Sequence, residues 1–452
     1  AEGFFSFPGL HSGNHRLKVT YIGFVPSDKV VALNDVDVTQ DFVMSDKSKE
    51  LNEVVVTGVF SGQQRAINTQ KSNVNITNVV SADQIGKFPD SNIGDALKRI
   101  SGINVQYDQG EARFGQVRGT PADFSSVTIN GSRIPSAEGD IRNVQLDLIP
   151  SDMIQTIEVN KTLMPDQDGD AIGGSINLVT KNSPQKFTLN AVAGSGYNQV
   201  SRKAQMNFGL TVGNRFFNDR FGFMASASYN NAPAGSYDTE FLWEKDDDGN
   251  LYVSDYQMRQ YFVTRERQSY SLSLDYKFDD FNKIWFKGIF NNRNDWENRY
   301  RTTLKDVTPK GVADVRVQTK GGSGDERDAR LERQRTMDFT LGGENRLGAV
   351  DLDWKIGYAR ASEDRPNERY IDYRLRKQHF SFDLSDPRTP FATPEEGYTM
   401  LLNDDFSLKD LTQQQENIVE RDFKIALDFK TRLSERSKLK FGFKFVNKTK
   451  HK

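Results

Sequence analysis

The chain has 452 residues, no cysteine, and 60 basic against 62 acidic residues, which gives a formal net charge of −2. The lack of cysteine excludes disulfides, thiolate metal sites and a cysteine nucleophile within these residues, and the balanced charge gives no general attraction to nucleic acid. No stretch approaches the roughly 20 apolar residues of a membrane-spanning helix. A transmembrane β-barrel would escape such a search, because only every second residue of its strands faces lipid.

Residues 1–48 contain short runs in which apolar and polar residues alternate, such as the run with Leu17, Val19 and Tyr21. Alternation of this kind is typical of strands with one buried face. The pattern is already present at the start of the chain, so we expect a small β-rich domain that lacks its beginning. The first residues do not have the charged and apolar regions of a signal peptide, so we expect any export signal to have been removed.

The next stretch, to about residue 183, mixes helix and strand signals. Ile93, Ala96, Leu97 and Ile100 recur at helical spacing, and the pattern predicts a helix with Asp90 or Ser91 as N-cap and an end at Gly102. Short strands are predicted at residues 127–129, 157–159 and 176–179. Together these signals indicate a compact α+β module.

From about residue 186 the sequence changes to long runs with period 2, for example Phe187, Leu189, Ala191 and Ala193 near the start and Leu439, Phe441, Phe443 and Phe445 near the end. Roughly ten such runs occur, each close to the 9–11 residues that a tilted strand needs to cross a bilayer. Short connections alternate with long polar loops, which we expect around residues 231–257, 299–333 and 384–418. This arrangement predicts the strands of an outer-membrane barrel. A soluble β-sandwich is the alternative, but its strands are usually only about 5–6 residues long.

Five segments between residues 53 and 180 resemble, in order and spacing, the plug region of TonB-dependent outer-membrane transporters. They are Glu53–Gly58, which resembles the TonB box, then Phe114–Gly119, Val127–Gly131, Ile154–Val159 and Gly173–Thr180. Residues 86–92 and 164–169 resemble one subgroup of this family. Residues 2–44 resemble the end of a carboxypeptidase-regulatory-like domain, a β-sandwich that precedes the box in some of these transporters.

The resemblance implies a mainly β fold, with a small α+β plug inside a large antiparallel transmembrane β-barrel. The expected domains are a partial carboxypeptidase-regulatory-like domain at 1–48, the TonB box and linker at 49–62, the plug at 63–183 and the first part of the barrel at 184–452. A plug of this size needs a wide lumen, as in barrels of about 22 strands. We therefore expect residue 452 to lie within the barrel.

The resemblance also implies roles for particular residues. The β-branched segment Glu53, Val54, Val55, Val56 and Thr57 is the expected TonB-binding site, because an extended segment can add as a strand to the edge of a partner sheet; an internal strand is the alternative. Arg118 and Glu158 match residues that form an ionic latch between plug and barrel wall. An ion pair within the plug remains the alternative for these two.

A ligand is expected to bind outside the membrane, between the long loops and the apices of the plug. The candidate contacts are Phe124, Arg133 and Ser136 of the plug and Phe241, Trp243 and Tyr252 of an outer loop. Aromatic rings could stack on sugars, or they could only pack one loop against another. The subgroup resemblance indicates an oligosaccharide or similar polymer breakdown product, with a siderophore or cobalamin as the alternative, or a structural or adhesion role in an outer-membrane complex.

No enzyme, cofactor or metal site is expected. The four histidines lie in no acid–base or metal pattern, and the aspartates of residues 166–170 lack the bidentate glutamate of a calcium loop. The resemblance implies TonB and its inner-membrane energising complex, the transported molecule and outer-membrane lipid as partners, without nucleic acid; a surface lipoprotein stays open. It also implies the outer membrane of a Gram-negative bacterium, with the N-terminal region in the periplasm.

Overall fold

The structure is a computed structural model that describes residues 5–20, 27–34, 37–42, 62–81, 84, 92–108, 110–139, 141–165, 167–169, 171–321, 330–397, 405–434 and 437–452. The chain divides into two compact units, Ala1–Arg65 and Ala66–Lys452. The predicted TonB box, Glu53 to Thr57, lies outside the described residues, as does most of the segment 86–92.

The first unit contains one antiparallel hairpin, formed by β1 (Gly13–Val19) and β2 (Ser27–Leu33). The exposed side chains of Arg16 and Asp28 form an ion pair of 2.6 Å across it. A two-stranded hairpin alone is at most marginally stable in water. The carboxypeptidase-regulatory-like domain at 1–48 therefore stays a prediction. Helix α1 (Gly62–Ser72) spans the boundary between the two units.

Residues 73–183 form a small domain, which is the predicted α+β module. Its five-stranded sheet has the order β3-β8-β9-β6-β7, in which β6 and β9 are parallel and the other pairs antiparallel. A separate hairpin pairs β4 with β5. The elements are β3 (Thr77–Ser81), α3 (Ile93–Leu97), β4 (Ile103–Asp108), β5 (Glu111–Val117), η1 (Ala122–Phe124), β6 (Ser125–Ile129), β7 (Ser132–Arg133), η2 (Leu146–Leu148), η3 (Ser151–Met153), β8 (Ile154–Asn160) and β9 (Gly174–Thr180).

Helix α3 begins one residue later than Ser91 and two later than Asp90, the N-caps predicted from the sequence. Its N-cap is Asn92, whose side-chain oxygen accepts a hydrogen bond of 3.0 Å from the backbone N–H of Asp95. Asn92 satisfies one of the donors that a helix start leaves open, as Asp90 or Ser91 would have done. The predicted end at Gly102 is wrong, because the helix already ends at Leu97 with Lys98 as C-cap. Gly102 has φ +78° in the turn that follows, a conformation that favours glycine.

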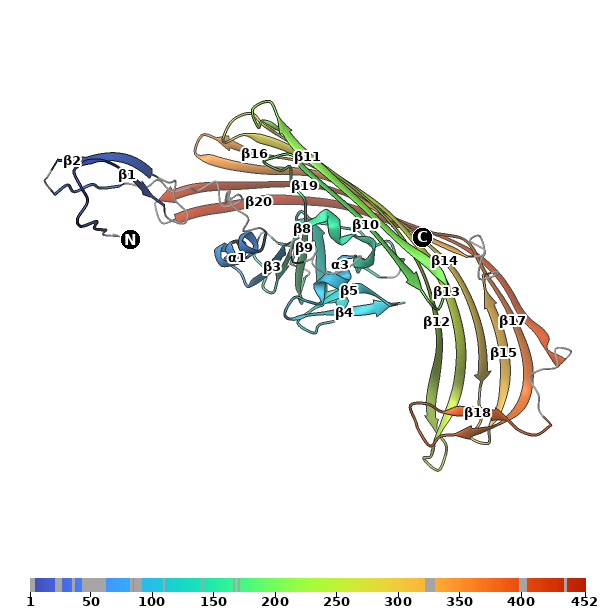
Figure 1. Ribbon diagram of the computed structural model, residues 1–452. Helices are drawn as coiled ribbons and strands as arrows, with labels where there is room; N and C mark the ends of the chain where they lie inside the picture. The colour runs from blue at the N-terminus through green and yellow to red at the C-terminus, as the bar shows by residue number, and fades with distance from the viewer. Residues whose placement is uncertain are drawn as a thin grey trace. The chain divides into compact units, whose positions relative to one another are not determined.

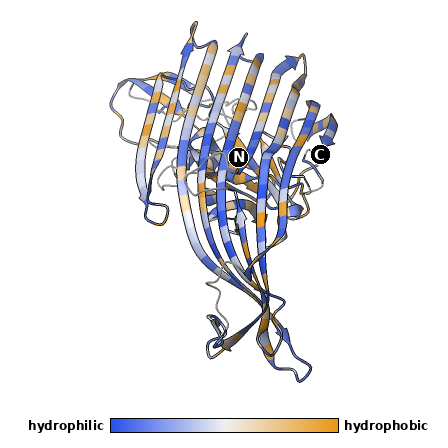
Figure 2. Cartoon of the chain, turned by 90° about the vertical axis from the view of Figure 1, so that its right-hand side faces the viewer, coloured by the Kyte–Doolittle hydropathy of each residue, from blue (hydrophilic) through white to orange (hydrophobic). Residues whose placement is uncertain are grey.

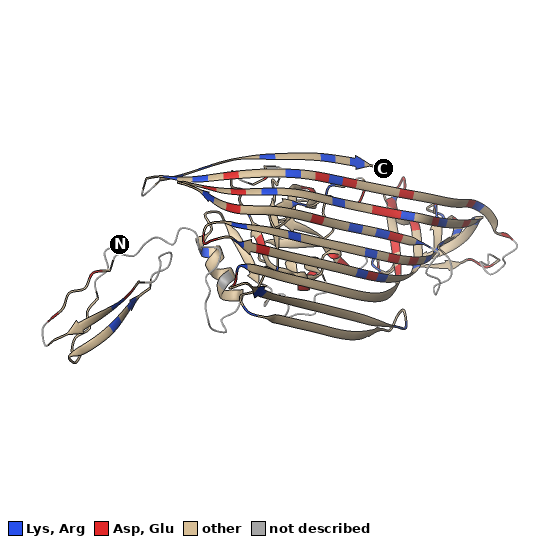
Figure 3. Cartoon of the chain, turned by 90° about the horizontal axis from the view of Figure 1, so that it is seen from above, with Lys and Arg blue, Asp and Glu red and all other residues tan. Residues whose placement is uncertain are grey.

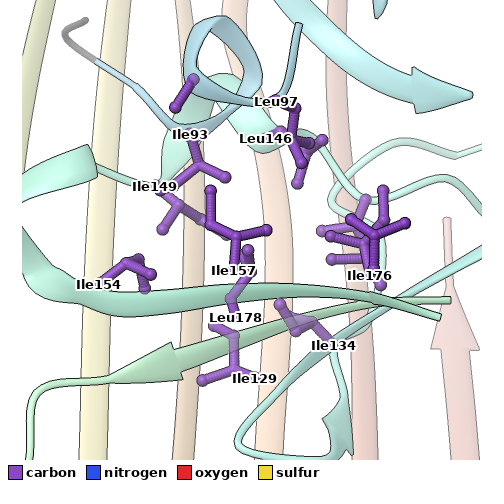
Figure 4. Packing of buried hydrophobic residues seen from close by; sticks show 14 of the residues in the cluster. Ile93, Leu97, Ile129, Ile134, Leu146, Ile149, Ile154, Ile157, Ile176 and Leu178 are labelled. Atoms are coloured by element: carbon purple, nitrogen blue, oxygen red, sulfur yellow. The ribbon is translucent and has the colours of Figure 1, made fainter. Parts of the chain in front are cut away.

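The core of the small domain lies between α3, η2 and the sheet (Figure 4). Its members come from every layer: Ile93 and Leu97 from α3, Leu146 from η2, and Ile157, Ile176 and Leu178 from the sheet. All are fully buried. Ile289, from the long sheet described next, belongs to the same cluster. The small domain and the long sheet therefore share apolar packing.

The rest of the second unit is one antiparallel sheet of eleven strands, with β10 and β20 at its two ends (Figure 1). The strands are β10 (Thr188–Asn198), β11 (Lys203–Phe216), β12 (Phe221–Lys245), β13 (Leu251–Lys277), β14 (Lys283–Lys305), β15 (Val312–Lys320), β16 (Leu331–Leu347), β17 (Val350–Asp383), β18 (Phe391–Pro394), β19 (Ser407–Ser434) and β20 (Ser437–His451). Most neighbours in sequence are neighbours in the sheet. The exceptions are β16, which pairs with β14 and β17, and β18, which pairs with β17.

One face of the long sheet carries an exposed apolar band next to the short turns. Along β20, for example, Leu439, Phe441, Phe443 and Phe445 are all exposed on the same face. Figure 2 shows apolar and polar residues alternating along the strands. We call this the outward face, and the face that contacts the small domain the inward face. The period-2 prediction is confirmed for the strands that carry this band, whereas β15 and β18 lie beyond it.

The expected long loops are mostly strand. Strands β12 and β13 pair from Phe221↔Tyr276 to Lys245↔Leu251, so the stretch 231–257 is a continuous hairpin with a short turn. Parts of 299–333 and 384–418 belong to β14, β15, β18 and β19 in the same way. The strands reach 34 residues in β17 and so extend well past the apolar band. Among the residues that the structure describes, no helix is both long and apolar enough to cross a membrane.

Candidate functional site

The small domain contacts the inward face of the long sheet through polar side chains. Lys287 of β14 donates to Asn130 Oδ1 at 3.3 Å. Ser132 donates to Asp338 Oδ2 at 3.3 Å and accepts from Lys424 Nζ at 3.0 Å. These contacts fix which residues of each strand face inward. Figure 3 shows basic and acidic residues distributed along the long strands.

Arg293 is the centre of a buried charge cluster between the two parts. Its guanidinium pairs with Asp147 of η2, and lies 3.4 Å from both Asp295 and Glu332 on the wall. The side chain of Arg293 is only 2% exposed and that of Asp147 only 3%. Removing one partner of a buried pair typically costs about 3–5 kcal/mol, because the other charge is left uncompensated. The loss of either Asp147 or Arg293 would therefore weaken the contact between the small domain and the wall.

Glu111, at the start of β5, makes the second charged contact. Its carboxylate pairs with Arg265 at 2.7 Å and with Arg267, both on β13. Arg265 also forms two parallel hydrogen bonds with Asp295, of 2.8 and 2.7 Å, so the two contacts belong to one network. Burial alone would raise the pKa of Glu111, but Arg267 and Arg265 outweigh it and lower the pKa. The carboxylate is therefore held in its charged form.

The last strands of the sheet also contact the small domain. Lys424 donates to the backbone carbonyl of Arg133, and Lys450 donates to that of Glu138 at 2.7 Å. Lys444 pairs with Asp168. Polar contacts of the small domain thus reach β11, β13, β14, β16, β19 and β20.

The two residues of the predicted latch lie within the small domain. Arg118 has φ +56° and is exposed; its side chain donates to the carbonyls of Gly173 and Ile172 at 3.1 and 3.3 Å. Glu158 on β8 accepts a hydrogen bond of 2.9 Å from Asn177. Burial raises the pKa of Glu158, although that hydrogen bond acts the other way. Within the described residues neither side chain bonds to the long sheet, so a latch between these two and the wall stays a prediction.

The predicted ligand contacts of the small domain differ in exposure. Phe124 in η1 is exposed and Arg133 in β7 is half-buried. Ser136 is 2% exposed, and its hydroxyl accepts hydrogen bonds from Glu138 N at 3.3 Å and Gln145 Nε2 at 3.5 Å. A ligand could meet Ser136 only after this part of the domain opened.

The predicted aromatic contacts lie on strands instead of a loop. Phe241 and Trp243 of β12 pack against a buried cluster that includes Tyr256, and the rings of Phe241 and Tyr256 are 5.0 Å apart. Tyr252 of β13 donates to Glu244 at 3.0 Å. Packing within the hairpin accounts for Phe241 and Trp243. Binding of a sugar ring by Trp243 or Tyr252 stays a prediction.

Sequence reasoning missed four arginines on the inward face beyond the small domain. Arg299 and Arg301 follow Arg293 at even spacing on β14, and both donate to the side-chain oxygen of Gln318, at 2.6 and 2.8 Å. Arg316 and Arg374 stand directly opposite each other on β15 and β17. The buried Nε atoms of all four have no hydrogen-bond partner within the described part of the chain. The available signal was a run of charges at every second position from residue 293 to 301.

A cavity of about 490 Å³ lies at the same level of the wall, but most of its lining residues face outward. Tyr237, Met258 and Tyr300 alternate with the inward Asp238, Arg259 and Arg301 along β12, β13 and β14, so the cavity does not belong to the inward arginine cluster. Arg259 is already paired with Asp238 at 2.5 Å. No group of three histidine, aspartate or glutamate residues placed to hold a metal occurs among the described residues. The site therefore offers cationic hydrogen-bond donors.

The small domain is similar to domains of known proteins. A family model described as the TonB-dependent receptor plug domain matches residues 69–175. A vitamin B12 transporter of Photobacterium profundum is 32% identical over 120 residues, which are 26% of this chain and 20% of that protein. Among solved structures, a ferric enterobactin receptor of Pseudomonas aeruginosa is 13% identical with a TM-score of 0.41, and covers 86% of this chain and 59% of its own. The ferric preacinetobactin receptor of Acinetobacter baumannii is 13% identical with a TM-score of 0.39, at 84% and 58%. The chain thus spans a fifth of the curated relative and less than two thirds of these structures.

Proposed function

We propose that this chain, which carries the plug domain of the TonB-dependent receptor family, takes part in the active uptake of a nutrient across the outer membrane of a Gram-negative bacterium. The observation that carries the proposal is the match of residues 69–175 to that plug domain. The same residues are attached to the inward face of the long sheet by buried ion pairs. A domain held in this way can obstruct a passage and can be released by force.

The outward face supports a position in a membrane. Its exposed apolar residues lie at every second position next to the short turns, as lipid-facing residues of a barrel do. The end strands β10 and β20 would leave unpaired backbone groups in lipid, which cost several kcal/mol each. We therefore include closure by further strands in the proposal. Short turns mark the periplasmic side of such barrels, so the far ends of β12 and β13 lie outside the cell.

The proposed mechanism begins with ligand binding above the plug domain. The segment Glu53 to Thr57 then adds as a strand to TonB in the periplasm, where main-chain hydrogen bonds give the affinity. Force from the inner membrane separates the plug domain from the wall. This separation must break the buried pairs Asp147–Arg293 and Glu111–Arg265. The ligand then passes, and the ion pairs re-form.

We propose an oligosaccharide as the substrate, and the inward arginines favour one with acidic groups. Arg299, Arg301, Arg316 and Arg374 supply cationic donors above the plug domain, and Arg–carboxylate pairs are strong and directional. A siderophore with carboxylate groups would meet the same donors, so it is the second candidate. The similarity to the vitamin B12 transporter covers 26% of this chain and gives no support for cobalamin at that wall. A surface lipoprotein partner and a structural or adhesion role remain separate proposals.

Deletion of Glu53 to Thr57 tests the proposal. A strain that depends on this protein is grown on a short oligogalacturonate, on the matching neutral oligosaccharide, or on a ferric carboxylate siderophore as iron source. We expect the deletion to abolish growth on one of the acidic compounds while the protein reaches the outer membrane at its normal level. Unchanged growth on every compound that the intact protein supports would contradict TonB-dependent uptake and favour the structural role.

A further inference from the structure

Two arginines face each other on the outward face just beyond the apolar band. Arg360 of β17 and Arg421 of β19 are direct cross-strand neighbours. Residues directly opposite in an antiparallel pair have Cα atoms only about 4.5–5.5 Å apart, and like charges in such positions destabilise a sheet. Neither guanidinium has a hydrogen-bond or ion-pair partner within the described ranges, and Arg360 Nε is buried. The pair can therefore bind an anion from outside the chain.

A third arginine lies beside them. Arg335 of β16 is one diagonal step from Arg360, because Met337 is the direct partner of Arg360. The Nε of Arg335 donates a hydrogen bond to Asn292 Oδ1 at 2.9 Å, so this bond does not use the two terminal nitrogens of the guanidinium. Within two positions of the three arginines along their own strands, the outward residues are Met337, Arg333, Tyr358, Ser362, Phe423 and Val419. No carboxylate is among them.

The position of this cluster relative to the apolar band indicates its partner. Phe339, Tyr358 and Phe423 form the next outward row toward the short turns, and all three are exposed. Aromatic rows of this kind mark the level of the lipid headgroups. Arg360 and Arg421 lie one row farther out and Arg335 lies two rows farther out, where the phosphates of the headgroups are found. Arg333, two positions along β16, has Asp364 at 3.5 Å and so differs from the cluster.

We propose that Arg335, Arg360 and Arg421 bind the phosphate of an anionic lipid headgroup in the outer leaflet of the membrane. This inference rests on the proposed function, which puts the long sheet in the outer membrane with these residues on its external side. The planar guanidinium groups would share the phosphate oxygens. The bound lipid neutralises the facing pair and fixes the depth of the sheet in the leaflet.

The test measures lipid retained by the full protein after extraction from outer membranes with mild detergent. The probe is lipid A with its phosphates, counted by native mass spectrometry through successive detergent washes. We expect R360Q/R421Q to retain at least about tenfold less lipid A than the unaltered protein, because each basic residue near an anionic surface contributes a several-fold gain in affinity. The matched control R333Q changes an outward arginine that already has a partner, and should retain lipid A within about twofold of the unaltered protein.

Two further arms change the ligand. Dephosphorylated lipid A should be retained no better by the unaltered protein than by R360Q/R421Q, and inorganic phosphate should not displace the phosphorylated form. Equal retention of both lipids, equal retention by R360Q/R421Q, or displacement by free phosphate would each overturn the proposal. Deleting residues 53–57 separates this inference from the proposed function, since it should abolish uptake and leave lipid A retention unchanged.

Discussion

Replacing Arg293 with methionine should loosen the small domain from the wall. The substitution keeps a long side chain but removes the cation shared by Asp147, Asp295 and Glu332. Loss of one partner from a buried pair typically costs about 3–5 kcal/mol. Even 3 kcal/mol corresponds to about a hundredfold rise in the population of the opened state, since 1.4 kcal/mol is tenfold.

Hydrogen exchange measures this opening directly. Backbone amides of η2 and β5 should exchange about a hundredfold faster in R293M, while those of β19 on the wall keep their rates. The control R333M removes an outward arginine whose partner Asp364 is partly exposed, and such pairs contribute only about 0–1 kcal/mol. Exchange of η2 in R293M within a few-fold of the unaltered protein would refute the reasoning. In D147N/R293M the loss should be smaller than the sum of the two single changes, because the two residues are in contact.

Three other substitutions test the small domain. The pKa of Glu111 is lowered, so the contribution of Glu111 to stability is complete above the ordinary carboxyl pKa and is lost as the pH falls through the lowered pKa. E111Q should therefore remove the dependence of the hydrogen-exchange rates on acid pH. The pKa of Glu158 is raised by burial, so the contribution of Glu158 to stability is complete below the ordinary carboxyl pKa and is lost as the pH rises through the raised pKa. E158Q should therefore make the stability less dependent on pH between acid and neutral solution. G94A would put a Cβ 1.9 Å from the carbonyl oxygen of Ala112, so we expect a loss of about 1–3 kcal/mol or more in unfolding experiments, and an unchanged midpoint would contradict the packing of α3 on β5.

The sequence predicted the apolar band of the long sheet well, because there the two faces differ in polarity. Phe441 and Phe443 alternate with Lys440 and Lys444, and period 2 is visible without any partner. Beyond the band the outward face also becomes polar. On β14, Asn292 and Asn294 face outward while Arg293 and Asp295 face inward, so the alternation disappears from the hydropathy. This is why strands beyond the band were expected to be loops.

The candidate site was much less predictable. Asp147 and Arg293 are 146 residues apart in the chain, and no local pattern states which aspartate meets which arginine. The charges on β14 were visible, but their partners depend on how the small domain is placed against the sheet. The sequence motifs instead indicated Arg118 and Glu158, whose described contacts stay within the small domain. Motifs identify the domain, whereas the contacts that hold it depend on the tertiary structure.

The central claim is that the small domain must leave the wall for a nutrient to pass, and a reversible cross-link tests it most directly. These 452 residues contain no cysteine, so S132C/D338C places a single pair of thiols within them, at positions whose side chains are 3.3 Å apart across the contact. We predict that joining these thiols with a short reducible linker abolishes uptake of the compound identified by the growth test. Cleavage of the linker should restore uptake, and the single variants should transport normally. Uptake at the unmodified rate by fully cross-linked protein would contradict the account.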